Sequence, residues 1–336
     1  MGEDHKSRPG KAMQFRFTGT TGAYFKIWIV NIALTLITFG VYYAWAKVRA
    51  KQYFYNNTII AGSSFKYTAL PLDIFKGWVI ALVFFTVYSV ATKISMESAL
   101  LFVAALIMLM PAMVLKSLMY RARHSVYQDL HFTFDNNYSD AMRCFLLLPL
   151  ATLLSAGLLF PYMLYHQKKF LVENHCYGNF RFSFVSRPAA FYQVSIISLT
   201  LMVVSGIGFT FLQTVPEPYH LLAPVQLALV YTYAIAFFNA GVTNLTYKAI
   251  TLRRNSFDAN LRAHHLTGLY IVHAFALVFS LGMLYPWVKV RMTNYRCKHI
   301  IFTAMEKPER LTRQTVDKTS AAGDELSEFL GFDFGL

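Results

Sequence analysis

Apolar segments alternate with polar, basic stretches along the whole chain. Seven of these segments reach or approach the roughly 20 apolar residues that a helix needs to cross the hydrocarbon core of a bilayer. Their approximate ranges are 27–46, 74–92, 98–118, 145–164, 189–212, 221–246 and 268–288. The pattern predicts an all-α, polytopic membrane protein.

One sequence motif closes three of these segments. The pattern G-x-x-Y-x-W-x-K-V-R-x-x-x-Y occupies residues 40–53 and recurs without a gap at 282–295. A degraded copy at 157–170 keeps the glycine but has Tyr, His and Phe at the Trp, Arg and final Tyr positions. Recurrence of this kind is typical of chains built from internal repeats.

The motif predicts two and a half repeats, each a motif segment followed by a basic stretch and a transmembrane helical hairpin. The predicted parts are a basic N-terminal tail (1–14), repeat 1 (15–131), repeat 2 (132–256), a partial repeat 3 (257–305) and a polar tail with an acidic, aromatic end (306–336). That end is either disordered or a docking segment for the basic face or a partner.

Two arrangements of the motif segments fit the pattern: each spans the bilayer, or each bends and leaves on the face that it entered. In the second arrangement, all of the 31 Lys and Arg residues except Lys93 lie on one face or in segments that return to it. That asymmetry is the one expected of a cytoplasmic face. Candidate hinge residues are Gly40, Gly157, Pro161, Gly282 and Pro286.

Composition supports a membrane environment. The chain is 56% hydrophobic and only 14% charged, and its mean hydropathy is +0.40, which leaves too few charges to cover a soluble globule. The net charge of +14 comes from basic residues at the ends of apolar segments. They predict contact with anionic phospholipid rather than nucleic acid. The first fourteen residues are polar and basic, so we expect a cytoplasmic N-terminus and no signal peptide.

The motif places a cation or a histidine between two aromatic residues on one helical stripe, because positions i, i+4 and i+8 share a face. The three stripes and their neighbouring lysines are Trp45, Lys47, Arg49 and Tyr53; Tyr162, His166 and Phe170; and Trp287, Lys289, Arg291 and Tyr295. One interpretation is a set of sites for lipid headgroups or an anionic substrate. The other is an ordinary aromatic belt with basic anchors.

Two polar residues lie deep in apolar segments. Asn31 and His273 both lie nine residues before their motif glycine. Buried polar groups in a membrane form interhelical hydrogen bonds or mark a translocation pathway. We expect a packing role here, with a pathway as the alternative.

Motifs for catalysis, cofactors and metals are absent from the sequence. The three cysteines form no CxxC pair, and HExxH, Walker A and GxSxG patterns do not occur. We therefore predict no catalytic residues, no cofactor and no metal site.

The repeated motif, the Phe-x-Phe entries at 15–17 and 132–134, and the acidic GDEL-type tail resemble the YjgN-type family of bacterial inner-membrane proteins. The resemblance covers nearly the whole chain and implies a multi-pass protein of the bacterial inner membrane. It brings no catalytic residues.

The leading functional hypothesis is a non-enzymatic membrane protein that binds or transports a lipid or a small amphipathic or anionic solute. Transport without an ATP-binding motif would be passive or ion-coupled. The alternative is a membrane scaffold or regulator that recruits partners through its basic face and acidic tail. A membrane redox or lipid-modifying enzyme has the least support.

Overall fold

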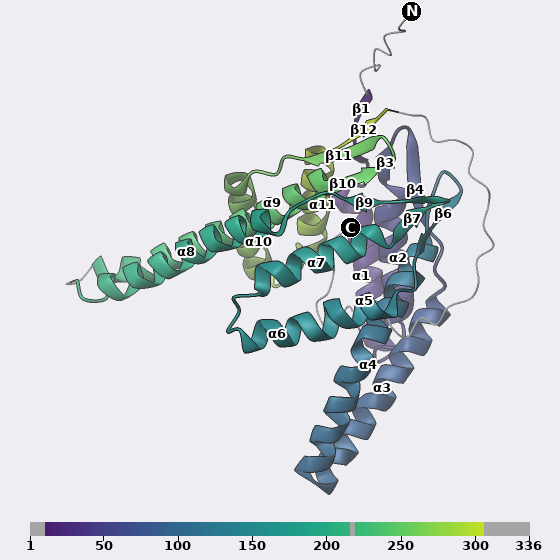
Figure 1. Cartoon of the computed structure of the whole chain (residues 1–336), viewed down its shortest axis with the longest axis horizontal. Coiled ribbons are helices and arrows are strands. Elements are labelled where there is room, and N and C mark those ends of the chain that lie inside the picture. The colour runs from purple at the N-terminus through teal and green to yellow at the C-terminus, as the bar shows by residue number, and fades with distance from the viewer. Residues whose placement is uncertain (1–10, 216–218, 306–336) are drawn as a thin grey trace, which may run out of the picture. The chain divides into compact units, whose positions relative to one another are not determined.

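The computed structural model describes residues 11–215 and 219–305 and is mostly helical (Figure 1). It divides into two compact units. One contains Phe17–Ser183, and the other contains the described residues up to Arg16 and from Phe184 onward. The predicted basic start of the N-terminal tail, the link at 216–218 and the tail from 306 lie outside the described residues.

The prediction of an all-α fold is wrong, because short strands between the helices form two β-sheets. The seven-stranded sheet has the order β2 (Arg16–Phe17), β3 (Thr58–Ile60), β4 (Ser63–Tyr67), β5 (Ser125–Tyr127), β6 (Leu130–Phe134), β7 (His175–Tyr177) and β8 (Phe180–Arg181). The five-stranded sheet has the order β1 (Lys11–Gln14), β12 (Ile300–Ala304), β11 (Asn255–Ala259), β10 (Ile250–Leu252) and β9 (Ser183–Phe184).

The strands pair antiparallel, and tight hairpins join β3 to β4, β5 to β6, β7 to β8 and β10 to β11. Between β3 and β4, Ile60 pairs with Ser63 across a two-residue turn, Ala61–Gly62. Both turn residues have positive φ, +50° and +82°, as expected for a type I′ turn, whose twist suits a two-residue hairpin loop. Strands of two to five residues are too short to give a clear alternating pattern, so the sequence did not predict them.

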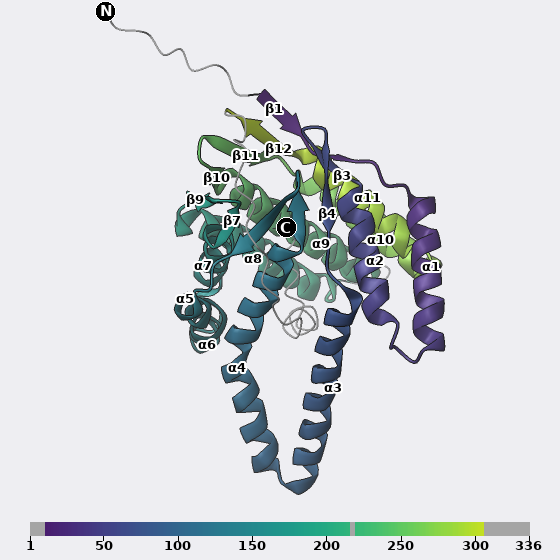
Figure 2. The same cartoon turned by 90° about the vertical axis from the view of Figure 1, so that its right-hand side faces the viewer.

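The unit Phe17–Ser183 carries three helical excursions from its sheet (Figure 2). The helices are α1 (Thr21–Ile37), α2 (Tyr43–Asn56), α3 (Pro71–Ile94), α4 (Met96–Arg123), α5 (Tyr138–Met142), the π-helix η1 (Arg143–Leu147), α6 (Leu148–Leu154) and α7 (Phe160–Glu173). α5, η1 and α6 follow one another without a break, so the three excursions are α1–α2, α3–α4 and α5–α7.

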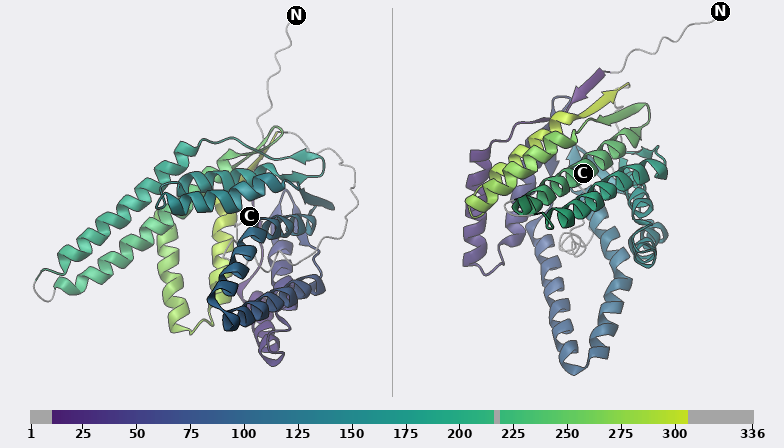
Figure 3. Two further views of the ribbon diagram at one scale, coloured as in Figure 1. Left: turned by 60° about the horizontal axis from the view of Figure 1, so that its bottom comes forward. Right: turned by 90° about the vertical axis from the view of Figure 1, so that its left-hand side faces the viewer.

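The second unit carries two excursions from its own sheet (Figure 3). Its helices are α8 (Pro188–Leu212), the short 3₁₀ turn η2 (Tyr219–Leu221), α9 (Leu222–Ala249), α10 (Ala263–Phe279) and α11 (Tyr285–His299). They form the hairpins α8–α9 and α10–α11.

Four helices of the described chain are long and apolar enough to cross a bilayer: α3, α4, α8 and α9, with 24 to 28 residues each. They are the two predicted transmembrane hairpins. The motif segments do not form single long helices. α1 and α10 have 17 residues each, and a turn then starts a second helix.

The packed core lies where the helices meet the sheets. In the first unit, one cluster joins α2, β4, α3 and α4, and a second joins α4, β6, the π-helix and α7. Tyr120 and Phe145 are among their largest fully buried side chains. The outer parts of the long helices are exposed and apolar instead, as expected for surfaces that lipid covers.

Candidate functional site

The three motif glycines form the turns of three helical hairpins. The amide of each glycine donates a 2.8 Å hydrogen bond to the carbonyl five residues earlier: Gly40 to Thr35, Gly157 to Thr152 and Gly282 to Leu277. Their φ angles are +91°, +88° and +85°. The residue before each glycine, Phe39, Ala156 or Leu281, is left-handed as well. These are the features of a Schellman ending, which needs positive φ.

A hydroxyl two residues before each glycine completes the turn. It accepts a hydrogen bond from the first amide of the returning segment: Thr38 from Tyr42 at 2.9 Å, Ser155 from Leu159 at 3.2 Å and Ser280 from Leu284 at 3.0 Å. We did not single out this position in the sequence, although Thr or Ser occupies it in all three copies. The predicted hinge residues Pro161 and Pro286 do not form the bend. They lie in the first turn of α7 and α11.

The final tyrosine of the motif closes the open end of two hairpins. Tyr53 donates to the carbonyl of Thr20 at 2.8 Å, and the Tyr295 hydroxyl accepts from the amide of Arg262 at 3.2 Å. Phe170 takes this position in the middle copy and packs edge-on against Phe134 and Phe145. These contacts join the start of one helix to the end of the next, so the paired helices are antiparallel.

Asn31 and His273 both face the returning helix of their own hairpin. The Asn31 side chain donates to the carbonyl of Ala46 at 3.2 Å. His273 packs edge-on against Trp287, with ring centroids 5.5 Å apart. Both residues are buried. Asn31 thus makes a hydrogen bond between the two helices of its hairpin, and His273 makes an aromatic contact between the two helices of its own.

The predicted cation–aromatic stripe takes a different form in each copy. The Arg291 guanidinium lies over the Trp287 ring, 4.8 Å from its centroid. The His166 ring lies 4.3 Å from that of Tyr162. Arg49 is exposed, and Trp45 lies beside Tyr42 instead.

The motif lysines also differ between copies. Lys47 is buried and lies 6.0 Å from the Tyr43 ring. Lys289 is exposed, lies 5.7 Å from the ring of Tyr285 and donates to its hydroxyl. Only the exposed lysine can meet an external anion without a change of packing.

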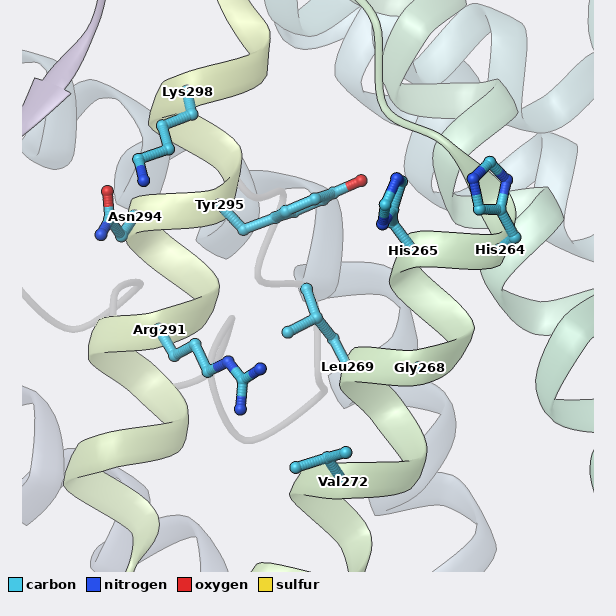
Figure 4. Close-up of a pocket in the computed structure, with 9 residues that line it drawn as sticks. All are labelled: His264, His265, Gly268, Leu269, Val272, Arg291, Asn294, Tyr295 and Lys298. Carbon is cyan, nitrogen blue, oxygen red and sulfur yellow. The ribbon is translucent and has the colours of Figure 1, made fainter.

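A groove of about 600 Å³ opens between α10 and α11 (Figure 4). Its lining residues are His264, His265, Gly268, Leu269, Val272, Arg291, Asn294, Tyr295 and Lys298. α11 supplies the two cations, an amide and a phenol, and α10 supplies the histidines and the apolar side chains. Of the predicted site residues, only Arg291 and Tyr295 line it.

None of the lining residues is acidic, so Arg291 and Lys298 have no carboxylate within the groove. The equivalent positions in the middle copy differ. Asp140 there lies 3.6 Å from Arg143, and Glu173 lies 4.0 Å from Lys169. Among the residues that the structure describes, the third copy therefore combines two cations that face no carboxylate in the lining with a cavity.

Metal chemistry finds no support in the part of the chain that the structure describes, which contains no cluster of three His, Cys, Asp or Glu side chains able to hold an ion. Cys144 and Cys297 are buried free thiols.

Four apolar helices of spanning length, with basic residues at the sheet end of the helical hairpins, define an integral membrane protein. The profile of the DUF898 family, described as bacterial proteins of unknown function, matches residues 12–329, and the chain belongs to this family.

Among curated proteins, the chain is similar to the inner membrane protein YjgN of Escherichia coli O157:H7, with 28% identity over 149 residues. It is also similar to YjgN of Salmonella typhimurium, with 33% identity over 122 residues. The matched stretches cover 44% and 35% of this chain, and 37% and 30% of those relatives. No solved structure matches. The protein is thus a multi-pass protein of the bacterial inner membrane.

Proposed function

We propose that the protein binds a phospholipid or another amphipathic anion in the groove between α10 and α11. The observation that carries this proposal is the pair of cations, Arg291 and Lys298, on the wall of a groove without a carboxylate. Two cations at the membrane surface, with no acidic residue in the described lining beside them, attract a phosphate or carboxylate group.

The lining also suits the apolar part of such a ligand. Leu269 and Val272 lie on α10, one and two turns further along than His265 (Figure 4). The start of α10 therefore contributes histidines to the groove, and its later turns contribute apolar side chains. An amphipathic ligand would place its charged group between Lys298 and Arg291 and its chain beside Leu269 and Val272 (Figure 4).

Arg291 is suited to hold the charged group. The contact with Trp287 fixes one face of the guanidinium and leaves its planar fork of N–H donors for an oxyanion. A lysine at this position would offer a more mobile point charge.

We infer also that the three motif hairpins are copies of one ancestral unit. The shared Schellman turns, the shared hydroxyl at the turn and the equivalent Tyr53 and Tyr295 contacts support this inference. The groove between α10 and α11 belongs to the third copy.

Native mass spectrometry of the purified protein, released from detergent, tests the binding proposal. We expect retained phospholipid in the wild type and at least a tenfold loss of retention in Arg291→Ala/Lys298→Ala, because each charge-assisted bond contributes about 1.5–3 kcal/mol. The matched control is Lys289→Ala/Arg296→Ala, which removes the same charge from the same helix outside the groove. Equal retention in the wild type and the groove variant, or equal loss in both variants, would contradict a groove site.

A further inference from the structure

The motif sets a fixed distance between the hairpin turn and its exposed cation. Arg49 and Arg291 each follow their turn glycine, Gly40 or Gly282, by nine residues. α2 and α11 begin three residues after the glycine, so six helical steps of about 1.5 Å, about 9 Å in all, separate the start of each helix from its arginine. Together with the turn beyond it, this distance fits within one leaflet, which is half of the roughly 30 Å hydrocarbon core.

That distance argues against a hairpin whose turn reaches the opposite membrane surface. In such a position the two arginines would lie near the centre of the bilayer. Both are exposed, so no protein would cover their charge, and an uncovered charge at that depth is very costly. With the arginines at headgroup depth, the turn lies near the midplane.

The side chains at the turns fit that depth. Phe39 is 94% exposed and Leu281 is 93% exposed. Leu154 and Leu158 flank the middle turn and are also among the exposed large apolar residues. Apolar side chains this open to their surroundings need a hydrocarbon environment.

Chain connections place both ends of each hairpin at a sheet. Every helix end that meets a strand is joined to it by at most three residues, for example Asn57 between α2 and β3. The spanning hairpins α3–α4 and α8–α9 begin and end at the same sheets as the motif hairpins of their units. In each unit, therefore, the motif hairpin starts on the side from which the spanning helices start.

We propose that the α1–α2 and α10–α11 hairpins re-enter the membrane from the side of the sheets, and that their turns contact the ends of the acyl chains of that leaflet only. The interaction surface is the apolar tip of each hairpin, and its partner is the hydrocarbon of a single leaflet. The middle hairpin, α5–α7, also starts and ends at its sheet, so nearly all of the Lys and Arg residues lie on the sheet side in this arrangement. The sheet side is therefore the cytoplasmic side.

Cysteine labelling across each hairpin tests the re-entry. The background chain carries Ala in place of Cys144, Cys176 and Cys297. A single cysteine then replaces one exposed residue on either flank of a hairpin. The flanking residues are Ala12 and Lys66 for α1–α2, and Arg254 and Met305 for α10–α11. We expect an impermeant maleimide to label all four only after the cells are permeabilised. Lys93→Cys and Thr214→Cys, beside the far ends of the spanning hairpins, are the positive controls for labelling from outside.

If the two cysteines that flank one hairpin were labelled from opposite sides of the membrane, the hairpin would span the bilayer and the proposal would be wrong. Labelling of both cysteines from outside would overturn the orientation. Depth is measured separately with a nitroxide at Phe39→Cys or Leu281→Cys in bilayers. We expect high accessibility to oxygen and low accessibility to a polar nickel complex, as at the midplane. Accessibility to the nickel complex equal to that at Thr214→Cys would contradict the midplane position.

Discussion

The hydroxyl of Tyr53 donates a 2.8 Å hydrogen bond to the carbonyl of Thr20, the residue that caps the start of α1. The Tyr295 hydroxyl makes the equivalent bond, at 3.4 Å, to the carbonyl of Arg262, which precedes α10. Each bond joins residues 33 positions apart, at the open end of a hairpin whose other end is the Schellman turn. The motif thus determines both ends of the hairpin, through its first residue and its last.

Removal of one of these hydroxyls should weaken the hairpin. For Tyr53→Phe we expect a loss of about 1 kcal/mol in the free energy of unfolding, the typical net value of one hydrogen bond. Thermal unfolding in detergent would show it as a lower Tm. The control is Tyr162→Phe, an exposed tyrosine of the same motif in the middle copy, and it should leave Tm unchanged. An unchanged Tm in Tyr53→Phe would mean that the bond does not stabilise the hairpin.

A side chain at a turn glycine should destabilise the hairpin. Gly40 has a φ of +91°, and a methyl group added there would meet only open space. The penalty for Gly40→Ala therefore comes from backbone conformation alone and should be about 1–2 kcal/mol. Gly22 lies in the first turn of α1, also with open space around it. Gly22→Ala should be neutral or stabilising by up to about 1 kcal/mol. We expect a higher Tm for Gly22→Ala than for Gly40→Ala. The reverse order would contradict the claim that the turn requires a positive φ at Gly40.

Stability should fall in mild acid because of His175. Burial lowers the pKa of this β7 histidine below its ordinary value of 6.5, against a smaller opposing effect of its hydrogen bond to the Leu171 carbonyl. The unfolded chain therefore binds the proton more readily, so the stability that the neutral ring provides is complete above pH 6.5 and is lost as the pH falls below it. Tm measured between pH 8 and pH 5 should fall less in His175→Gln. An equal fall of Tm in the wild type and in His175→Gln would show that other titrating groups cause the loss of stability.

An added carboxylate should oppose anion binding in the groove. Asn294→Asp has nearly the same shape as the wild type and places a negative charge beside Arg291 and Lys298. We expect a several-fold loss of retained anionic phospholipid in native mass spectra, since the new carboxylate competes for the two cations. Asn239→Asp on α9, outside the groove lining, is the matched control. Stronger retention in Asn294→Asp would indicate a cationic ligand.

The sequence predicts the parts of this fold that depend on length and hydropathy. The four spanning helices have 24 to 28 residues each and are apolar enough to cross a bilayer, which a hydropathy pattern detects directly. The strands were missed because β3 and β5 have three residues each and lie in stretches whose basic residues dominated the pattern. Their pairing joins Phe65 to Tyr127, a contact that no local pattern encodes.

The sequence predicted only those contacts of the site that lie within one helix. Spacing alone placed Arg291 and Trp287 on one face of a helix, and they are in contact. The same spacing placed Arg49 beside Trp45, but the Trp45 ring packs against Phe75 of α3 instead. The groove residues His264, His265 and Lys298 were not predicted. They lie on two different helices, and the spacing of residues along the chain does not give the distance between those helices.

Fluorescence of Trp287 tests the central claim most directly. A variant that keeps Trp287 and carries Phe at positions 28, 45 and 78 would be titrated in detergent with an anionic phospholipid brominated near its headgroup. Lipid bound in the groove predicts saturable quenching of Trp287, reversed by unlabelled anionic lipid and abolished by Arg291→Ala/Lys298→Ala. Quenching that rises linearly with lipid, or that is the same in the groove variant, would contradict the claim that this groove binds an amphipathic anion.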